Sequence, residues 1–199
     1  MPRQFEFLYD IVSPTAYLAW YSAPETANSV GAEIVYTPIF LGGIMQGAGN
    51  TPPGMVPAKG RYLSIDVPRC AAHIGVPYHL NPAFPVNTLG VQRATVGMDD
   101  PDERNRFAKA CFDYTWGRPD PLNLGTDDAL QALCAAEGFD FERIKTLATD
   151  PANKAKLKAN TDHALERGVF GAPTFFVGDE IFFGHDRLDY VARAVEAAN

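Results

Sequence analysis

The sequence predicts an α/β protein in which two segments containing β-strands flank a block of helices. Three observations indicate this order. Residues 4–37 have the pattern strand, helix, strand; residues 61 to about 165 show apolar residues at helical spacing; and residues from Thr174 onward have the pattern strand, strand, helix. The 199 residues, 46% of them hydrophobic and 21% charged, fit one folded unit with a sizeable core.

The first segment contains two predicted strands. Aromatic residues occupy alternate positions from Phe5 to Tyr9, which is typical of a strand, and this strand should end near Asp10. The stretch EIVY, residues 33–36, predicts a second strand. Because a helical segment connects them, we expect the two strands to be parallel with a right-handed crossover.

The connecting helix should begin at Ser13, which is a good N-cap residue and is followed by Pro14 at the first helical position. It should end before Gly31. Pro24 is expected to kink or shorten it, because proline removes a backbone donor inside a helix.

Residues 38–60 are dense in glycine and proline and lack periodicity, so they predict a long loop of functional interest. The helical block follows and is broken by several proline-containing stretches. After it we predict strands at 174–177 and 181–183, joined by a turn at 178–179, and a last helix from Asp186.

This order of elements resembles a thioredoxin fold whose middle is interrupted by a helical insertion. We therefore predict a thioredoxin-like domain formed by residues 1–61 and 153–199, and an all-helical insertion domain formed by residues 62–152.

Ser13 stands where thioredoxin-like folds place a reactive C-x-x-C motif, and the motif position here has the sequence Ser13-Pro14-Thr15-Ala16. Because both cysteine positions lack sulfur, any thiol chemistry at this place must use a thiol from outside the chain. The N-terminus of a helix stabilises a thiolate, and the Ser13 hydroxyl would add a hydrogen-bond donor. The alternative is that Ser13 only caps its helix.

The segment Gly171-Ala172-Pro173-Thr174 precedes a predicted strand, where thioredoxin-like proteins carry a cis-proline. A cis bond before Pro173 would leave the backbone N–H and C=O of Ala172 free to pair with a peptide-like ligand. The alternative is a trans proline that opens an edge strand.

Three separated blocks, FLYDIVSPTAYLA, GAGNTPPGMVPAKGRY and GVFGAPTFFVGDEIFFGHDRLD, together resemble the 2-hydroxychromene-2-carboxylate isomerases and the related kappa-class glutathione transferases. The resemblance covers essentially the whole chain. It implies that glutathione is the cofactor and that Ser13 donates a hydrogen bond to the glutathione sulfur. It also implies that Asn50 and Lys59 bind the polar ends of the tripeptide, with the Lys59 ammonium pairing with a carboxylate. Without the family, Lys59 would be interpreted as an exposed surface lysine.

The resemblance implies a second group of contacts near the C-terminus. Ala172 and Pro173 match the backbone clamp on the cysteinyl unit, and Gly184-His185-Asp186 match the segment that takes the γ-glutamyl end, with Asp186 facing its ammonium. Asp186 could also cap the last helix. The family usually has Asn or Ser where this chain has His185, so that contact could be altered or become pH-sensitive.

The implied activity is glutathione-dependent isomerisation of a small aromatic carboxylate, 2-hydroxychromene-2-carboxylate, to trans-o-hydroxybenzylidenepyruvate in aromatic catabolism. Candidate substrate contacts in the helical block are Asn87, Arg93 and Trp116, each of which also has a structural interpretation as cap, surface charge or core aromatic. Two alternatives remain: a kappa-class glutathione transferase or peroxidase that uses the same thiolate, and a non-catalytic thioredoxin-like protein that binds peptides.

Composition restricts partners and location. The net charge of −7 and the scattered basic residues disfavour nucleic acid or an anionic membrane as partner. No membrane span or signal peptide is evident. The cysteines Cys70, Cys111 and Cys134 are far apart, predict neither a disulfide framework nor a metal site, and are expected to be small buried apolar residues. We therefore expect a cytoplasmic protein, and the resemblance allows a homodimer.

Overall fold

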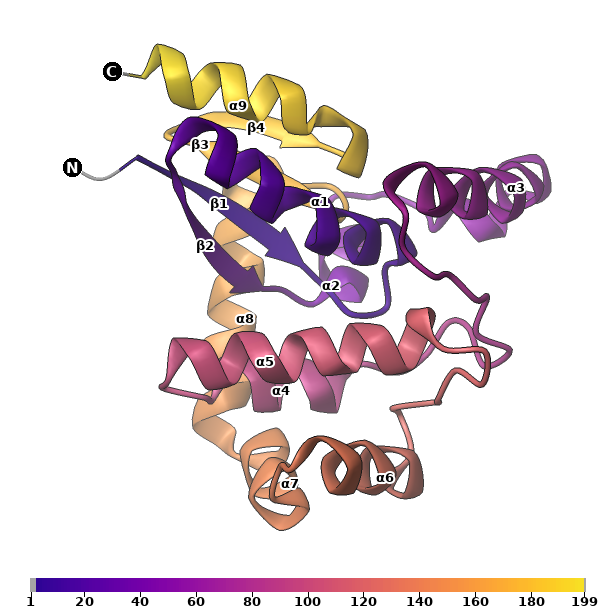
Figure 1. Cartoon of the computed structure of the whole chain (residues 1–199). Helices are drawn as coiled ribbons and strands as arrows, with labels where there is room; N and C mark the ends of the chain where they lie inside the picture. Colours follow the sequence, from indigo (N-terminus) through magenta and orange to yellow (C-terminus); the bar gives the residue numbers. More distant parts are fainter. Residues whose placement is uncertain (1–2, 199) are drawn as a thin grey trace.

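The computed structural model describes residues 3–198 and contains a four-stranded sheet surrounded by helices (Figure 1). Its elements are, in order, β1 (Gln4–Tyr9), α1 (Pro14–Val30), β2 (Glu33–Pro38), α2 (Leu41–Gly47), the 3₁₀ turn η1 (Pro53–Met55), α3 (Pro57–Ile74), α4 (Leu89–Val96), α5 (Pro101–Phe112), the π-helical turn η2 (Asp113–Gly117), α6 (Asp127–Glu137), α7 (Phe141–Thr149), α8 (Pro151–Glu166), β3 (Thr174–Val177), β4 (Glu180–Phe183), the 3₁₀ turn η3 (His185–Arg187) and α9 (Leu188–Ala197).

The sheet has the strand order β2-β1-β3-β4 and is mixed. The first two strands are parallel, with Phe7 opposite Tyr36, whereas β3 is antiparallel to β1 and places Phe175 opposite Phe7. β4 is antiparallel to β3. The predicted α/β thioredoxin-like fold with a helical interruption is thereby confirmed.

Alternation along β1 divides its side chains between two hydrophobic cores. Phe5, Phe7 and Tyr9 enter a large core with side chains of α1 and α9, and Leu8 enters a smaller core with residues of α2 and α8. The sheet is therefore covered by helices on both faces, and the second half of β1, from Phe7 to Tyr9, is apolar and buried on both.

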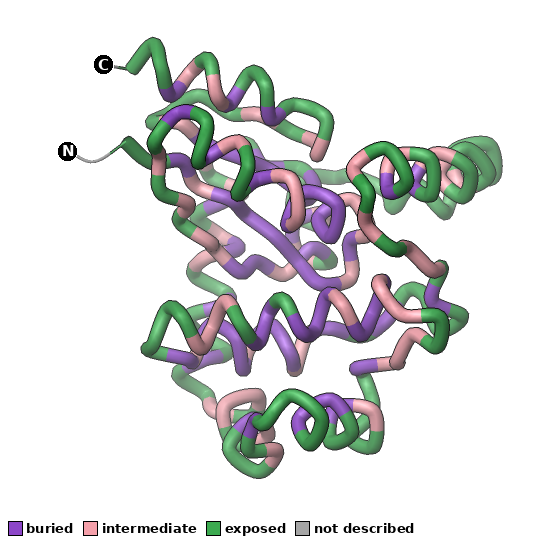
Figure 2. Tube along the Cα trace, viewed as in Figure 1, coloured by how far each residue is buried: buried purple, intermediate pink, exposed green. Residues whose placement is uncertain are grey.

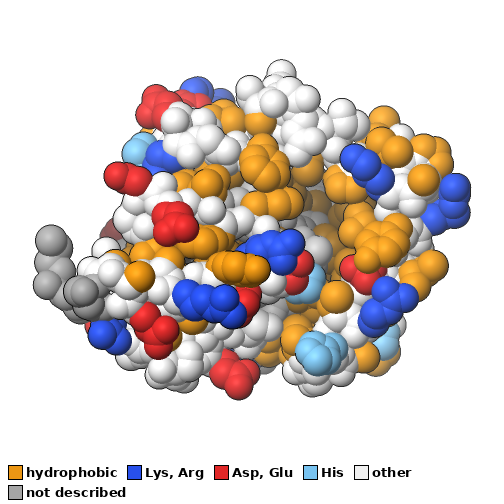
Figure 3. All heavy atoms as spheres, turned by 90° about the horizontal axis from the view of Figure 1, so that it is seen from above, with side chains coloured by type: hydrophobic (Ala, Val, Ile, Leu, Met, Phe, Trp, Pro, Cys, Tyr) orange, Lys and Arg blue, Asp and Glu red, His pale blue; other side chains and the backbone are white. Residues whose placement is uncertain are grey.

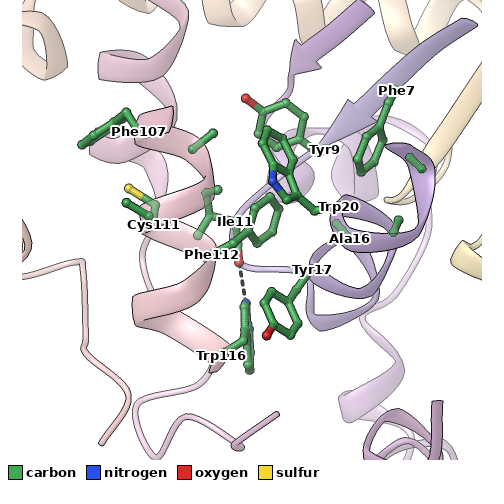
Figure 4. Close-up of a cluster of buried hydrophobic side chains, with 14 of the residues drawn as sticks. Phe7, Tyr9, Ile11, Ala16, Tyr17, Trp20, Phe107, Cys111, Phe112 and Trp116 are labelled. Carbon is green, nitrogen blue, oxygen red and sulfur yellow. Dashed lines mark hydrogen bonds between the residues drawn. The ribbon is translucent and has the colours of Figure 1, made fainter. Parts of the chain in front are cut away.

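The large core extends into the middle helices, as the buried positions in Figure 2 show. In Figure 4, Trp20 of α1 packs against both Tyr9 of β1 and Phe112 of α5, with ring centroids 5.1 Å and 5.3 Å away. Helices α3 and α8 both cross a predicted domain boundary, at residues 61 and 153. The division into two domains stays a prediction, and the apolar packing links the two parts.

The prediction of a loop from residue 38 to 60 was wrong over much of that range, because α2, η1 and the start of α3 lie there. Packing explains why α2 is helical although it contains several glycines, which are poor helix formers. A Cβ on Gly47 would lie 2.5 Å from a methyl carbon of Leu165, so the small residue lets α2 approach α8 closely. This tertiary contact offsets the low intrinsic helix propensity of glycine.

Helix α1 is not shortened at Pro24 as predicted, and it runs on to Val30. Pro24 is exposed, and the helix ends at Gly31, whose φ of 62° lies in the left-handed region that favours glycine.

The last helix begins at Leu188 and not at Asp186, because residues 185–187 form the 3₁₀ turn η3.

The cysteine prediction holds for two of three residues. Cys111 and Cys134 are buried, whereas Cys70 is only half-buried, with its Sγ 3.9 Å from Asp66 Oδ2.

Within residues 3–198 no group of His, Cys, Asp and Glu side chains is placed to hold a metal ion. Over the same residues, no helix combines the length and apolar character needed to cross a membrane.

Trp116 joins the helical block to the segment that precedes Ser13. Its indole is fully buried, and its Nε1–H donates to the Ile11 carbonyl over 2.8 Å (Figure 4). Ile11 is itself fully buried, so no solvent is close enough to replace this donor.

We expect Trp116→Phe to destabilise the protein by about 1–2 kcal/mol more than Trp20→Phe does, because only the first change leaves a buried carbonyl without its donor. Trp20 is a matched control, since it is a core tryptophan with several aromatic neighbours and no hydrogen bond of its Nε1 within the described chain. The free energy of unfolding in urea measures the difference. Equal losses would show that the Trp116–Ile11 bond contributes nothing beyond packing.

Candidate functional site

Ser13 lies at the junction between β1 and α1. Its N–H donates to the Asp10 carbonyl over 3.0 Å, which forms the turn, and its Oγ accepts from Ala16 N–H over 3.1 Å, which caps the helix. Only 4% of Ser13 is exposed. A serine hydroxyl therefore stands at the N-terminus of a 17-residue helix, where the helix dipole favours negative charge.

Asp10 holds the surroundings of this turn together, and sequence reasoning missed it. Its buried carboxylate accepts from Thr88 Oγ1 at 2.6 Å, from Leu41 N–H at 2.8 Å and from Val12 N–H at 3.2 Å. Burial raises the pKa of Asp10, and these hydrogen bonds oppose the rise. Its place directly after a strand and before a capped helix is the signal that could have found it.

The bond between Ala172 and Pro173 is cis, as predicted. Ser13 Oγ donates to the Ala172 carbonyl over 3.0 Å, and Thr15 Oγ1 reaches the same oxygen over 3.3 Å. The Ala172 N–H makes no hydrogen bond with any residue from 3 to 198. The turn after β1 and the proline loop before β3 therefore meet at one point, and one backbone donor there is unused.

The segment Gly184-His185-Asp186 lies next to this point, because Gly184 N–H donates to the Pro173 carbonyl over 3.0 Å. His185 is half-buried; burial lowers its pKa, while the negative charges of Asp186 and Asp66 oppose that shift. Asp186 is exposed and pairs with Arg187 at 3.2 Å. The alternative role of Asp186 as a cap is wrong, because the residue before α9 is Arg187 and no side chain caps that helix.

Asn50 and Lys59 approach from the segment after α2. Asn50 Nδ2 donates to the Phe170 carbonyl over 2.8 Å, so Asn50 lies beside the proline loop. Lys59 is in the first turn of α3 and lines a shallow cavity of about 380 Å³ together with Tyr62. Seen from above, the surface is hollowed between α3 and the rest of the molecule (Figure 3).

Contacts thus join most of the predicted site residues. Ser13 bonds the Ala172 carbonyl directly, and Gly184 joins the segment of His185 and Asp186 to Pro173. Asn50 bonds the carbonyl of Phe170, which stands two residues before Ala172 in the sequence. Lys59 makes no hydrogen bond or ion pair with any of these residues. Whether they bind a ligand stays a prediction.

Asn87 and Trp116, two of the residues predicted to contact the substrate, make hydrogen bonds within the protein. Asn87 accepts from Leu89 N–H at the start of α4, and Trp116 is buried. Arg93 is half-buried on α4. Sequence reasoning missed Phe84, which is exposed and packs edge-on against Trp116 with ring centroids 5.6 Å apart. It offers an aromatic surface close to the turn that leads to Ser13.

The fold is that of a thioredoxin-like protein in which the cis-proline loop contacts the N-terminus of α1, and in this chain Ser13 stands at the first position of the motif. The chain belongs to the DsbA-like thioredoxin domain family, whose model matches residues 4–196.

Individual relatives agree with the resemblance predicted from the sequence and confirm it. A 2-hydroxychromene-2-carboxylate isomerase of Sphingobium xenophagum is 31% identical, with 96% of this chain and 97% of the relative covered. Glutathione S-transferase kappa 1 of Homo sapiens is 27% identical, with 96% and 90% covered. A solved structure of a 2-hydroxychromene-2-carboxylate isomerase superposes with a TM-score of 0.87 at 25% identity over 98% of this chain and 95% of that one. These relatives are isomerases and transferases, which supports an enzymatic activity for this chain.

The partial burial of His185 predicts a pH dependence of stability. Because its pKa in the folded protein is lower than the ordinary 6.5, the unfolded chain binds the proton more tightly. The stability associated with neutral His185 is therefore complete above about pH 6.5 and is lost as the pH falls toward the folded pKa.

We expect His185→Asn to flatten the fall in unfolding free energy below about pH 6.5, because asparagine does not titrate. Urea unfolding measured across this range for wild type and variant gives the difference. His73→Asn is the control, since His73 is an exposed histidine on α3. Parallel pH curves for wild type and His185→Asn would contradict the prediction.

Proposed function

We propose that this protein is a glutathione-dependent isomerase that acts on a small aromatic carboxylate of the 2-hydroxychromene-2-carboxylate type. The observation that carries the proposal is the Ser13 hydroxyl, placed at the N-terminus of α1 and against the carbonyl that precedes the cis-proline. This place suits a thiolate, and the chain supplies no sulfur to it.

The thiol must come from outside the chain. Cys111 and Cys134 are buried and burial raises the pKa of each, so neither offers a thiolate. Cys70 lies on α3, and its pKa is raised as well, by burial and by the Asp66 carboxylate. Glutathione is a small external thiol with a peptide backbone, which fits the unused N–H of Ala172.

The remaining groups fit the charges of that tripeptide. In the proposed complex, the Asp186 carboxylate pairs with the γ-glutamyl ammonium and the Lys59 ammonium pairs with a glutathione carboxylate. Asn50 and His185 supply further polar contacts on either side of the proline loop. The surface is hollowed between α3 and the rest of the molecule, which leaves a space open to solvent (Figure 3).

In the reaction, the hemiketal ring of the substrate opens first: the ring C–O bond breaks, the hemiketal hydroxyl becomes the ketone carbonyl, and its proton passes to the phenolic oxygen. The thiolate then adds to a carbon of the conjugated system, and the electron pair of the C=C bond moves toward the carbonyl. The former double bond then rotates as a single bond. The electron pair returns, the C–S bond breaks, and the thiolate is regenerated, so the thiol is not consumed. The protein contributes stabilisation of the thiolate and orientation of both partners.

A kappa-class glutathione transferase is the second candidate, favoured by the 27% identity to the human enzyme over 96% of this chain. The same thiolate would then remain attached to an electrophilic substrate or reduce a peroxide. Either activity requires reduced glutathione, which fits a reducing compartment such as the cytoplasm. A homodimer fits both candidates.

One assay separates the candidates. Purified protein is given 2-hydroxychromene-2-carboxylate with and without glutathione, and in parallel a halogenated aromatic and a peroxide with glutathione. The proposal expects glutathione-dependent formation of trans-o-hydroxybenzylidenepyruvate with no loss of thiol. Thiol consumption with the other substrates alone would favour the transferase, and binding of glutathione without any turnover would favour a peptide-binding protein.

We expect Ser13→Ala to raise the pKa of bound glutathione by about one to two units, because one charge-assisted hydrogen bond worth roughly 1.5–3 kcal/mol is lost. The rate should fall most at neutral pH and recover at alkaline pH, where glutathione ionises unaided. A pH–rate profile and an ultraviolet titration of the bound thiolate measure this.

Ser22→Ala is the matched control, because Ser22 is on the same helix and its hydroxyl bonds only the Leu18 carbonyl among residues 3–198. It should behave as wild type. A Ser13→Ala variant with unchanged thiol pKa and unchanged rate would show that Ser13 is only a helix cap.

A further inference from the structure

Two hydroxyl groups share one carbonyl oxygen at the candidate site. Ser13 Oγ lies 3.0 Å from the Ala172 oxygen, Thr15 Oγ1 lies 3.3 Å from it, and the two hydroxyl oxygens are 3.1 Å apart. These three atoms form a closed triangle of hydrogen-bonding partners. Thr15 is half-buried in the first turn of α1, on the side of the proline loop.

The number of protons in this triangle limits what Ser13 can do. A hydroxyl carries a single proton, and the proton of Ser13 is directed at the Ala172 carbonyl. The Ser13 oxygen also accepts from Ala16 N–H over 3.1 Å. Ser13 can therefore donate to a thiolate only if its proton leaves the Ala172 oxygen.

Rotation of the Ser13 hydroxyl toward a thiolate would remove a hydrogen-bond donor from the Ala172 carbonyl. This carbonyl has little access to water, because only 7% of Ala172 is exposed. A buried acceptor that loses its donor is costly. Thr15 removes this cost, since its hydroxyl already lies within reach of the same oxygen and its one other partner among residues 3–198 is Ser13 Oγ itself.

We propose that Thr15 is a positioning residue that releases the Ser13 proton for the incoming thiolate by taking over the hydrogen bond to the Ala172 carbonyl. This inference rests on the proposed function. A carbonyl oxygen has two lone pairs, so a backbone N–H of glutathione can share the Ala172 oxygen with Thr15 while Ser13 turns to the sulfur. In the protein without ligand, the hydroxyls of Ser13 and Thr15 both contact the Ala172 carbonyl oxygen.

The test compares the pKa of glutathione bound to wild type, Thr15→Val, Thr15→Ser and Ser13→Ala, followed by ultraviolet absorbance of the thiolate. Valine keeps the shape of threonine and lacks the hydroxyl, whereas serine keeps the hydroxyl. We expect Thr15→Val to raise the thiol pKa by about 0.5–1 unit, which lowers the thiolate fraction below that pKa by about 3- to 10-fold. Thr15→Ser should remain close to wild type, and Ser13→Ala should show the larger shift.

A double variant tests whether Thr15 acts through Ser13. In a Ser13→Ala background, Thr15→Val should cause no further rise, because there is no serine proton left to release. Thr26→Val is the control for removing a hydroxyl from α1, since the Thr26 hydroxyl donates to the Ser22 carbonyl and makes no other hydrogen bond within residues 3–198. Urea unfolding of each variant confirms that the fold is retained.

Each outcome is decisive. If wild type ionises bound glutathione and Thr15→Val does the same, or if Thr15→Ser is as impaired as Thr15→Val, the role of Thr15 is overturned while the proposed function stands. Additive shifts in the double variant would also overturn it, because Thr15 would then act independently of Ser13. If wild type neither binds nor ionises glutathione, the proposed function fails and the inference fails with it.

Discussion

The hydrogen bond from Ser13 Oγ to the Ala172 carbonyl is the contact on which the site depends, because it joins residues 159 positions apart in the sequence. The sheet makes this contact available. Leu8 lies opposite Thr174 in the antiparallel pair of β1 and β3, so the turn that follows β1 and the loop that precedes β3 are at the same edge. A shift of register would separate the serine from the proline loop and also turn the apolar side chains of β1 to the wrong face.

Two buried polar interactions keep the turn after β1 in place. The Asp10 carboxylate collects donors from the turn, from the start of α2 and from Thr88 before α4, while the Trp116 indole donates to Ile11. Both links come from parts of the chain outside the β-α-β unit. The helical block therefore does more than cover the sheet, since it supplies the partners that hold the serine-bearing turn.

The sequence allowed prediction of the strands, α1 and the cis-proline because local residue types determine them: alternating aromatic residues, a Ser-Pro start and the Ala172-Pro173 context. The helix α2 could not be predicted, because its glycines pack closely against side chains that include Thr161 and Leu165, which lie far along the chain. The hydrogen-bond partners of Ser13, Asp10 and Thr15 could not be predicted from the sequence either. Hydrogen-bond partners that come from distant segments leave no periodic pattern in the sequence.

Replacing cysteine by serine at the start of α1 changes what the thioredoxin fold can do without changing its geometry. A cysteine there would be the nucleophile, and the helix N-terminus would stabilise its thiolate. A serine hydroxyl is too weak an acid to ionise there, but it donates a hydrogen bond where the helix dipole favours negative charge. The Ala172 N–H close to this hydroxyl makes no hydrogen bond with any residue from 3 to 198, and under the proposed function it pairs with the peptide backbone of the ligand. A fold built to hold its own thiol thereby becomes suited to hold the thiol of a second molecule.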